Sequence, residues 1–273
     1  MLRRPEGRFD TCLLIQSTID RCLVYHPSVL LLSKAIAFSV IGSFGGLLAA
    51  SVLLVLSPGT RLRLVPHLVS YAVGTLLGVA LLTILPEVLA QLSASAALGA
   101  LLVGILLFFV LEKLVLWRHC HSQDCEVHGR PAPLILIGHG FHAFVDGAAI
   151  GAAVQISIPL GLSTAVAVAI HEIPQQVGDY AILLGAGYSR GRALILSVLS
   201  AASAILGTLA IFLAFGRAPG LLPYALAVAA ASFLYIAMAD LMPDLHRGRV
   251  DANSLKQILL IAAGIATALL LRE

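Results

Sequence analysis

Two short stretches of the 273-residue chain place histidine and carboxylate at helical spacing. In the first, His142 and Asp146 are four residues apart, and His139 lies seven residues before Asp146, so all three share one face of a helix. The second stretch covers residues 171–179 and adds a further imidazole with carboxylates and carboxamides. Two neighbouring helices that present these groups at one depth can form a mixed nitrogen and oxygen site. Such a site suits zinc and other first-row divalent cations.

Within the second stretch, the same spacing sorts the polar residues into two stripes. His171 and Gln175 are four residues apart and share a face, while Glu172, Gln176 and Asp179 form an adjacent stripe. A structural polar network that only holds helices together is the alternative interpretation of such residues. Two such sets in neighbouring segments favour a functional site.

The composition predicts that these residues lie inside a membrane. The chain is 59% hydrophobic and 11% charged, whereas soluble domains are about 45–50% apolar and about 25% charged. This excludes a soluble globular enzyme and a disordered chain. Aromatic residues make up only 6%, and the apolar runs are long and unbroken, which disfavours an outer-membrane barrel. We therefore predict an all-α integral membrane protein, in which a mid-membrane charge costs at least about 2.5 kcal/mol and marks a functional site.

The sequence predicts eight transmembrane helices within a single domain, residues 35–271. Residues 1–34 are predicted to form an N-terminal tail, and residues 117–132 a polar connector on the cytoplasmic side. Apolar stretches of spanning length lie near 35–56, 68–90, 94–116, 133–155, 162–184, 193–215, 221–241 and 255–271.

Lysine and arginine gather in alternate connectors. Connectors between odd and following even helices hold ten of these residues, for example Arg61 and Arg190, while the others hold only Arg217. The positive-inside rule then places these connectors in the cytoplasm and both termini outside. Basic residues in the tail, such as Arg3 and Lys34, argue the other way. Because the basic residues alternate with apolar runs, they indicate topology and not nucleic-acid binding.

The sequence resembles the ZIP family of divalent-metal transporters, and in particular the branch with an HEIPHE-type fifth helix. The resemblance covers about 35–271 and is carried by HAFVDGAAIG at 142–151 and HEIPQQVGDY at 171–180. Further matching stretches are LPE at 85–87, FFVLEK at 108–113, FLYIA at 233–237 and DLMPDLH at 240–246.

The resemblance implies an eight-helix bundle with a central metal site between helices four and five. His142, Asp146, His171 and Glu172 would be ligands, and Gln175 stands where the family has a further histidine. Asp240, Asp244 and His246 would line the release route on the cytoplasmic side. The implied function is transport of divalent cations toward the cytoplasm, with zinc first and Fe²⁺, Mn²⁺ or Cd²⁺ as other candidates.

Several residues depart from the family pattern at this site. Ala143 replaces an asparagine, Gln175-Gln176 replaces a His-Glu pair, and His139 replaces an acid. Ser203 stands where some members have a polar or acidic helix-six ligand. The second of two adjacent metal positions is therefore depleted, and we expect one good site.

Two further sets of residues are candidates outside the central site. Glu87, at the outer end of the second span, could be an entry acid, and a solvated helix end is the alternative. The polar connector could capture metal as it leaves, because thiolate and imidazole bind soft cations. Its candidates are His119, Cys120, His121, Cys125 and His128.

Two other classes of function remain open at this point. An intramembrane metal hydrolase is one, but an HExxH motif needs a second histidine where this chain has Gln175, and Pro174 lies within the motif. A metal sensor or structural relative is the other. We predict a transporter that is not an enzyme, with a divalent metal ion and the bilayer as partners, no nucleic acid, and a homodimer as its candidate assembly. A bacterial-type cytoplasmic membrane is the predicted location.

Overall fold

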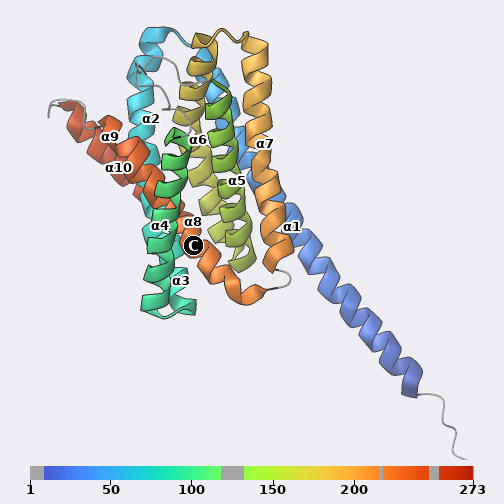
Figure 1. Cartoon of the computed structure of the whole chain (residues 1–273). Helices are drawn as coiled ribbons and strands as arrows, with labels where there is room; N and C mark the ends of the chain where they lie inside the picture. The colour runs from blue at the N-terminus through green and yellow to red at the C-terminus, as the bar shows by residue number, and fades with distance from the viewer. Residues whose placement is uncertain (1–8, 118–131, 216–217, 246–251, 273) are drawn as a thin grey trace, which may run out of the picture.

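The structure is a bundle of antiparallel helices from which the first part of α1 projects (Figure 1). It is a computed structural model that describes residues 9–117, 132–215, 218–245 and 252–272, and within these ranges it contains helices and short turns but no strand. The all-α prediction is confirmed. The elements are α1 (Phe9–Val55), α2 (Pro58–Gly78), η1 (Val79–Ile84), α3 (Leu85–Gln91), α4 (Ala94–Trp117), α5 (Ala132–Ile156), α6 (Ile158–Gly185), α7 (Arg190–Phe215), η2 (Pro219–Leu221), α8 (Leu222–Tyr235), η3 (Ile236–Leu241), α9 (Met242–Leu245) and α10 (Ala252–Leu270).

Every predicted span coincides with a helical segment of the described chain. Predicted spans four and five correspond to α5 and α6, and the eighth to a shorter apolar helix, Ser254–Leu270. Helix α1 begins at Phe9 and passes without a break through residue 34, where the sequence predicted the end of a tail. Among the residues that the structure describes, five segments are long and apolar enough to cross a membrane, namely Val29–Val55, Gly59–Gln91, Ala94–Lys113, Arg190–Phe215 and Leu222–Leu241.

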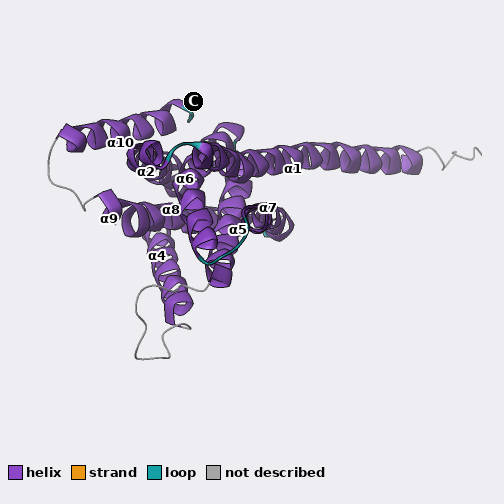
Figure 2. Cartoon of the chain, turned by 90° about the horizontal axis from the view of Figure 1, so that it is seen from above, coloured by secondary structure: helices purple, strands orange, loops and turns teal. Residues whose placement is uncertain are grey.

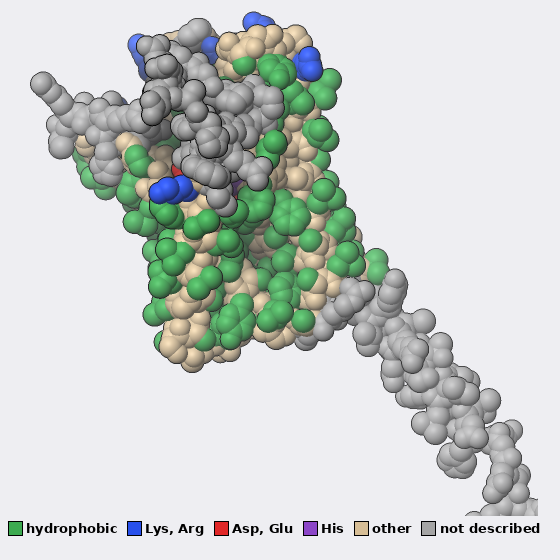
Figure 3. All heavy atoms as spheres, in the orientation of Figure 1, with side chains coloured by type: hydrophobic (Ala, Val, Ile, Leu, Met, Phe, Trp, Pro, Cys, Tyr) green, Lys and Arg blue, Asp and Glu red, His purple; other side chains and the backbone are tan. Residues whose placement is uncertain are grey.

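The distribution of side chains is that of a protein surrounded by lipid. Helix α4 exposes Leu102, Val103, Leu106 and Phe109, each of them about half exposed or more. Figure 3 shows hydrophobic side chains over most of the visible face, with most of the visible Lys and Arg side chains at one end. Polar residues such as Ser39 and Thr75 are instead buried between helices. An apolar exterior around a partly polar interior fits a chain that spans a bilayer.

Two helices are interrupted by π-helical segments that precede prolines. Segment η1 leads into Pro86 and η3 leads into Pro243, and in both places an acidic residue follows the proline. Proline cannot donate a hydrogen bond to the carbonyl four residues earlier, so this carbonyl needs another donor or a local change of helical pitch. For Pro86 the carbonyl is that of Leu82, which accepts a hydrogen bond from Arg272 Nη1 at 3.0 Å.

Helices α5 and α6 form a tight hairpin around a single non-helical residue, Ser157. The backbone of Ser157 is extended, with φ −158° and ψ 153°, and its hydroxyl accepts a hydrogen bond from the N–H of Leu160 at 3.2 Å. Pro159 follows within the first turn of α6, where its missing N–H costs nothing. Because one residue separates the two helices, their registers are fixed relative to each other.

Glycines at helix crossings divide the bundle into groups of closely packed helices. Gly147 of α5 contacts the backbone of Ala204 on α7, and Gly207 of α7 contacts the carbonyl of Phe144 on α5. Gly46 of α1 lies against α6 in the same way. These contacts join α1, α5, α6 and α7 into one group. Other close glycine contacts join α2 to α10 and α4 to α8, and Figure 2 shows these pairs side by side.

Replacement of Gly147 by alanine is expected to destabilise the fold. A Cβ at this position would overlap the backbone of Ala204, and overpacking of this kind costs about 1–3 kcal/mol. Gly138 on the same helix has open space around its would-be Cβ, so Gly138→Ala is a matched control. Thermal unfolding of the purified variants in detergent should place Gly147→Ala well below wild type and Gly138→Ala at or above it. Equal melting temperatures for the two variants would contradict the close α5–α7 contact.

Candidate metal centre

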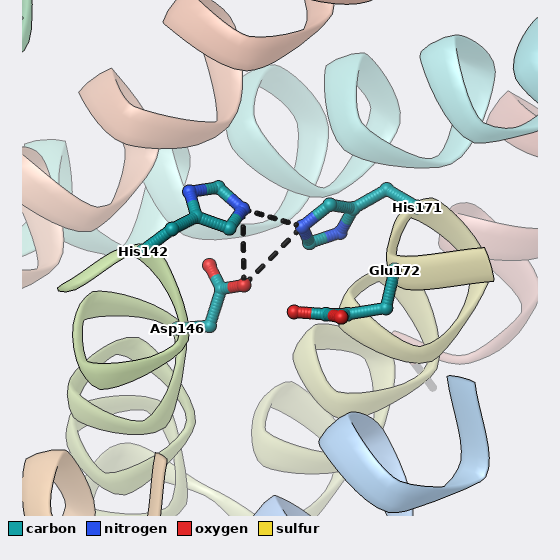
Figure 4. A group of neighbouring side chains, drawn as sticks. All are labelled: His142, Asp146, His171 and Glu172. Atoms are coloured by element: carbon teal, nitrogen blue, oxygen red, sulfur yellow. Dashed lines mark hydrogen bonds and ion pairs between the residues drawn. The ribbon is translucent and has the colours of Figure 1, made fainter. Parts of the chain in front are cut away.

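The hairpin brings the two polar stretches of the sequence to the same level. His142 lies nearly as many residues before Ser157 as His171 and Glu172 lie after it. In an antiparallel pair of helices, positions equally far from the turn face each other. The labelled side chains of α5 and α6 therefore meet between the two helices (Figure 4), and three of the four are fully buried.

Three side chains form a close triangle of nitrogen and oxygen atoms. The Nε2 atoms of His142 and His171 are 3.1 Å apart. Asp146 Oδ2 lies 3.4 Å from His142 Nε2 and 3.2 Å from His171 Nε2. Glu172 extends its carboxylate toward the same point (Figure 4), and one ligand atom from each of the four residues lies within 4.8 Å of the others.

The edges of this triangle match the spacing of ligands around a zinc ion. In a tetrahedral zinc site the metal–nitrogen and metal–oxygen bonds are about 2.0–2.2 Å, which places neighbouring ligand atoms about 3.3 Å apart. The edges of the triangle, 3.1, 3.2 and 3.4 Å, bracket this value. A cation placed among these atoms would thus need little rearrangement of the side chains.

The four side chains are held away from water, and three of their four carboxylate oxygens lack a hydrogen-bond partner. Asp146, His171 and Glu172 are fully buried, and only His142 is partly exposed. Both carboxylate oxygens of Asp146, and Oε1 of Glu172, have no hydrogen-bond partner. With neutral imidazoles the two carboxylates carry a charge of −2, which is costly to bury without a partner. One divalent cation would neutralise this charge.

Neighbouring groups fix the orientation of His171. Its Nδ1 lies 3.0 Å from the carbonyl oxygen of Ala167, one turn earlier in α6. Because a carbonyl only accepts, Nδ1 carries the proton and Nε2 presents a bare lone pair to the triangle. Phe233 of α8 covers the same imidazole, with ring centroids 6.3 Å apart, and is itself fully buried. The sequence analysis assigned no role to Phe233, although it lies in one of the stretches that carry the family resemblance.

The remaining polar residues of the two stretches form a second layer, farther from Ser157. Gln175 Nε2 lies 3.3 Å from His139 Nδ1, so this amide contacts His139. Gln176 Nε2 lies 2.8 Å from His139 Nε2 and donates to Glu172 Oε2 at 3.0 Å. Asp179 Oδ2 lies 3.1 Å from His139 Nδ1.

The other predicted site residues that the structure describes lie on other elements, and two of them have hydrogen-bond partners outside the cluster. Ser203 donates to the carbonyls of Gly140 and, at 2.7 Å, Ser200. Glu87 accepts a hydrogen bond from Gln91 at 2.9 Å near the end of α3. Asp240 is exposed on η3, and Asp244 lies in α9. His246 and the connector candidates His119, Cys120, His121, Cys125 and His128 lie outside the described residues.

A family model described as "ZIP Zinc transporter" matches residues 118–272, which is more than half of the chain. The chain belongs to the ZIP zinc transporter family. The matched region includes α5, α6 and all four residues of the cluster. The expectation from the sequence resemblance is thereby confirmed at the level of the family.

Named relatives of this ZIP family member are zinc transporters of animals. Zinc transporter ZIP13 of Pongo abelii is 33% identical over 221 residues, which cover 75% of this chain and 66% of that protein. Zinc transporter foi of Drosophila melanogaster is 38% identical over 152 residues, 55% of this chain and 21% of that protein. Zinc transporter ZIP10 of Homo sapiens is 40% identical over 136 residues, 48% of this chain and 16% of that protein.

These relatives bear on two predictions. They are described as transporters, which supports the prediction that the chain is not an enzyme. They agree with a multi-pass membrane protein, but as animal proteins they do not support the predicted bacterial-type membrane.

Zinc binding should separate the cluster from its neighbour Gln175. His142→Ala or His171→Ala removes one corner of the triangle, so we expect zinc affinity to fall at least about a hundredfold, as for loss of a zinc ligand. Gln175→Ala should change affinity less than about threefold, because the Gln175 amide contacts His139. Isothermal titration of the purified variants measures both effects. A loss in Gln175→Ala as large as in His171→Ala would make Gln175 a ligand.

Proposed function

We propose that the chain transports divalent metal cations across the membrane toward the cytoplasm, with zinc as the principal ion. The proposal rests mainly on the buried triangle of His142, Asp146 and His171, whose nitrogen and oxygen atoms lie at the spacing of zinc ligands. Neither carboxylate oxygen of Asp146 has a hydrogen-bond partner. Glu172 would complete the set of ligands. The ion would exchange its water shell for two imidazoles and two carboxylates.

The direction of transport rests on the arrangement of basic residues. The turn between α1 and α2 is followed by Arg61 and Arg63, and α7 begins with Arg190 and Gly191-Arg192. The α1–α2 turn and the start of α7 lie at the same end of the bundle (Figure 1), where most of the Lys and Arg side chains visible in Figure 3 gather. The positive-inside rule assigns that end to the cytoplasm. The end that carries them is called the arginine end below.

A relative motion of two groups of helices is the proposed mechanism. The cluster lies on α5 and α6, which glycine contacts join to α1 and α7. Phe233, which covers His171, belongs to α8, outside this group. In this mechanism the group formed by α1, α5, α6 and α7 moves against the remaining helices. The movement would carry the ion past the ring of Phe233 and open the site to each side of the membrane in turn. This is the alternating-access principle of many transporters.

Other parts of the proposal concern the ion and the assembly. Sulfur is absent from the cluster, and its imidazole and carboxylate ligands are also compatible with Fe²⁺, Mn²⁺ and Cd²⁺. A homodimer and a bacterial-type membrane stay predictions from the sequence. Size-exclusion chromatography with light scattering would measure the number of chains in the detergent-solubilised protein.

Uptake into proteoliposomes tests the proposed function. Wild-type protein should give saturable zinc uptake, and a His142→Ala/His171→Ala variant should lose it at equal reconstitution, because the ion loses two ligands. Zn²⁺, Fe²⁺, Mn²⁺ and Cd²⁺ are compared in parallel to rank the ions. Gly138→Ala, which changes α5 in open space, is the matched control and should transport normally. Binding without flux in the wild type would instead indicate a metal sensor or a structural relative.

Acid should weaken binding to the same cluster. Both imidazoles must be neutral to bind the ion, so protons compete with it. Between pH 7.5 and pH 5.5 we expect the zinc affinity of the wild type to fall by about tenfold or more. Titrations at the two pH values, corrected for buffer binding to zinc, measure the change. An affinity that is independent of pH in this range would contradict binding through histidine.

A further inference from the structure

The guanidinium of Arg272 contacts the backbone of a helix that is distant in sequence. Arg272 follows the last turn of α10, and its Nη1 donates to the carbonyl oxygen of Leu82 in η1 at 3.0 Å. Pro86, four residues after Leu82, has no N–H group to donate to this carbonyl. The side chain of Arg272 therefore replaces the donor that the proline lacks. Because the guanidinium is charged, its hydrogen bond is stronger than one between neutral groups.

The surroundings of Leu82 explain why this donor is needed. Leu81 and Leu82 are the exposed residues of η1, and Leu269 and Leu270 at the end of α10 are exposed as well. In a chain that spans the membrane such side chains face lipid, which offers no hydrogen bond to a free carbonyl. Arg272 lies beyond the end of α10, where a long side chain can reach back along an apolar surface.

Helix α10 is held against α2 up to the point where Arg272 makes its contact. Gly264 of α10 lies against the backbone of α2, and Gly78, the last residue of α2, lies against Ala268 of α10. Backbones in such close contact do not slide freely along each other. Arg272 is four residues beyond Ala268, and Leu82 is four residues beyond Gly78. The packing of the two helices thus places the guanidinium beside the carbonyl.

Segment η1 is also the part of this helix that meets the helices of the metal centre. It packs against α6, which carries His171 and Glu172, and against α8, which carries Phe233. Its buried residues are Val79, Ala80, Thr83 and Ile84. A change from π-helical to α-helical pitch would rotate these side chains relative to α6. The hydrogen bond from Arg272 therefore acts on a surface along which α6 is proposed to move.

We propose that Arg272 is a positioning residue for transport, whose hydrogen bond to Leu82 holds η1 in the π-helical form against which α6 moves. Helix α2 begins at the arginine end and leads into η1, so this role belongs to the opposite half of the bundle. Arg272 contacts η1 and not the cluster, so it affects the rate of transport and not the affinity for zinc. The inference rests on the proposed function.

Zinc uptake into proteoliposomes, together with zinc binding in detergent, tests this proposal. Arg272→Ala removes the donor, so the maximal rate of uptake should fall at least about threefold, while the Kd for zinc stays within about twofold of wild type. Melting temperatures and reconstitution levels are measured for each protein. An unchanged rate in Arg272→Ala, or a loss of zinc affinity as large as the loss of rate, would overturn the proposal.

Pro86→Ala provides a background in which Arg272 should no longer matter. Alanine restores an N–H group that can donate to the carbonyl of Leu82. In this background Arg272→Ala should change the rate of uptake by less than about 1.5-fold, because the two substitutions act on one interaction. The comparison separates the hydrogen bond from a general effect of losing a charge. An equal loss of rate in both backgrounds would contradict the role assigned to the hydrogen bond.

Hydrogen exchange measures the same coupling without transport. In Arg272→Ala the amides of residues 79–91 should exchange at least about fivefold faster than in wild type, while those of the α5–α6 hairpin keep their rates. The same substitution in the Pro86→Ala background should leave residues 79–91 unchanged. Unchanged exchange in Arg272→Ala would overturn the inference. Absence of zinc uptake by the wild type would instead contradict the proposed function, so the two proposals fail separately.

Discussion

The buried carboxylate of Asp146 is the constraint on which the rest of the structure depends. Neither of its oxygens has a hydrogen-bond donor, and its neighbours are the imidazole nitrogens of His142 and His171. An isolated charge in such surroundings costs several kcal/mol, so the position needs a cation or a proton during the working cycle. A carboxylate whose counter-charge is a mobile cation can bind and release that cation, as a transporter requires. A structural network would instead satisfy these oxygens permanently with donors from the chain.

The fold supplies the rigidity that keeps these acceptors together. Ser157 fixes the register of α5 and α6, and the glycine contacts hold α7 and α1 against this hairpin with backbone touching backbone. In lipid there is little hydrophobic force between helices, so close contact at small residues has to provide the stability. The large apolar side chains of α4, by contrast, face outward, where lipid would surround them. Polar groups are thereby concentrated where the ion is proposed to bind.

Much of this could be predicted from the sequence because helix geometry is simple. Spacing of four residues placed His142 and Asp146 on one face, and their apolar surroundings placed them inside a membrane. The same rule placed Gln175 on the face of His171, and the structure adds that its amide contacts His139 on the neighbouring helix. Spacing within one helix gives its faces but not which face of the neighbouring helix lies opposite. That relation depends on the single-residue turn at Ser157, whose conformation the sequence does not reveal.

The roles of Gln176 and Phe233 lay beyond sequence reasoning for related reasons. The sequence presented Gln176 as a missing acid, whereas the structure shows its amide donating to Glu172 and facing His139. Phe233 is distant in sequence from His171, and only the packing of α8 brings the two rings together. Both depend on contacts between helices, which periodicity alone cannot supply.

X-ray absorption at the zinc edge of the purified, zinc-loaded protein tests the central claim most directly. With one ion bound per chain, the account predicts four nitrogen and oxygen ligands at about 2.0–2.2 Å, with the scattering pattern of two imidazoles. That pattern should disappear in the His142→Ala/His171→Ala variant. A zinc ion surrounded by oxygen atoms alone, or one whose imidazole signal survives in that variant, would contradict the account.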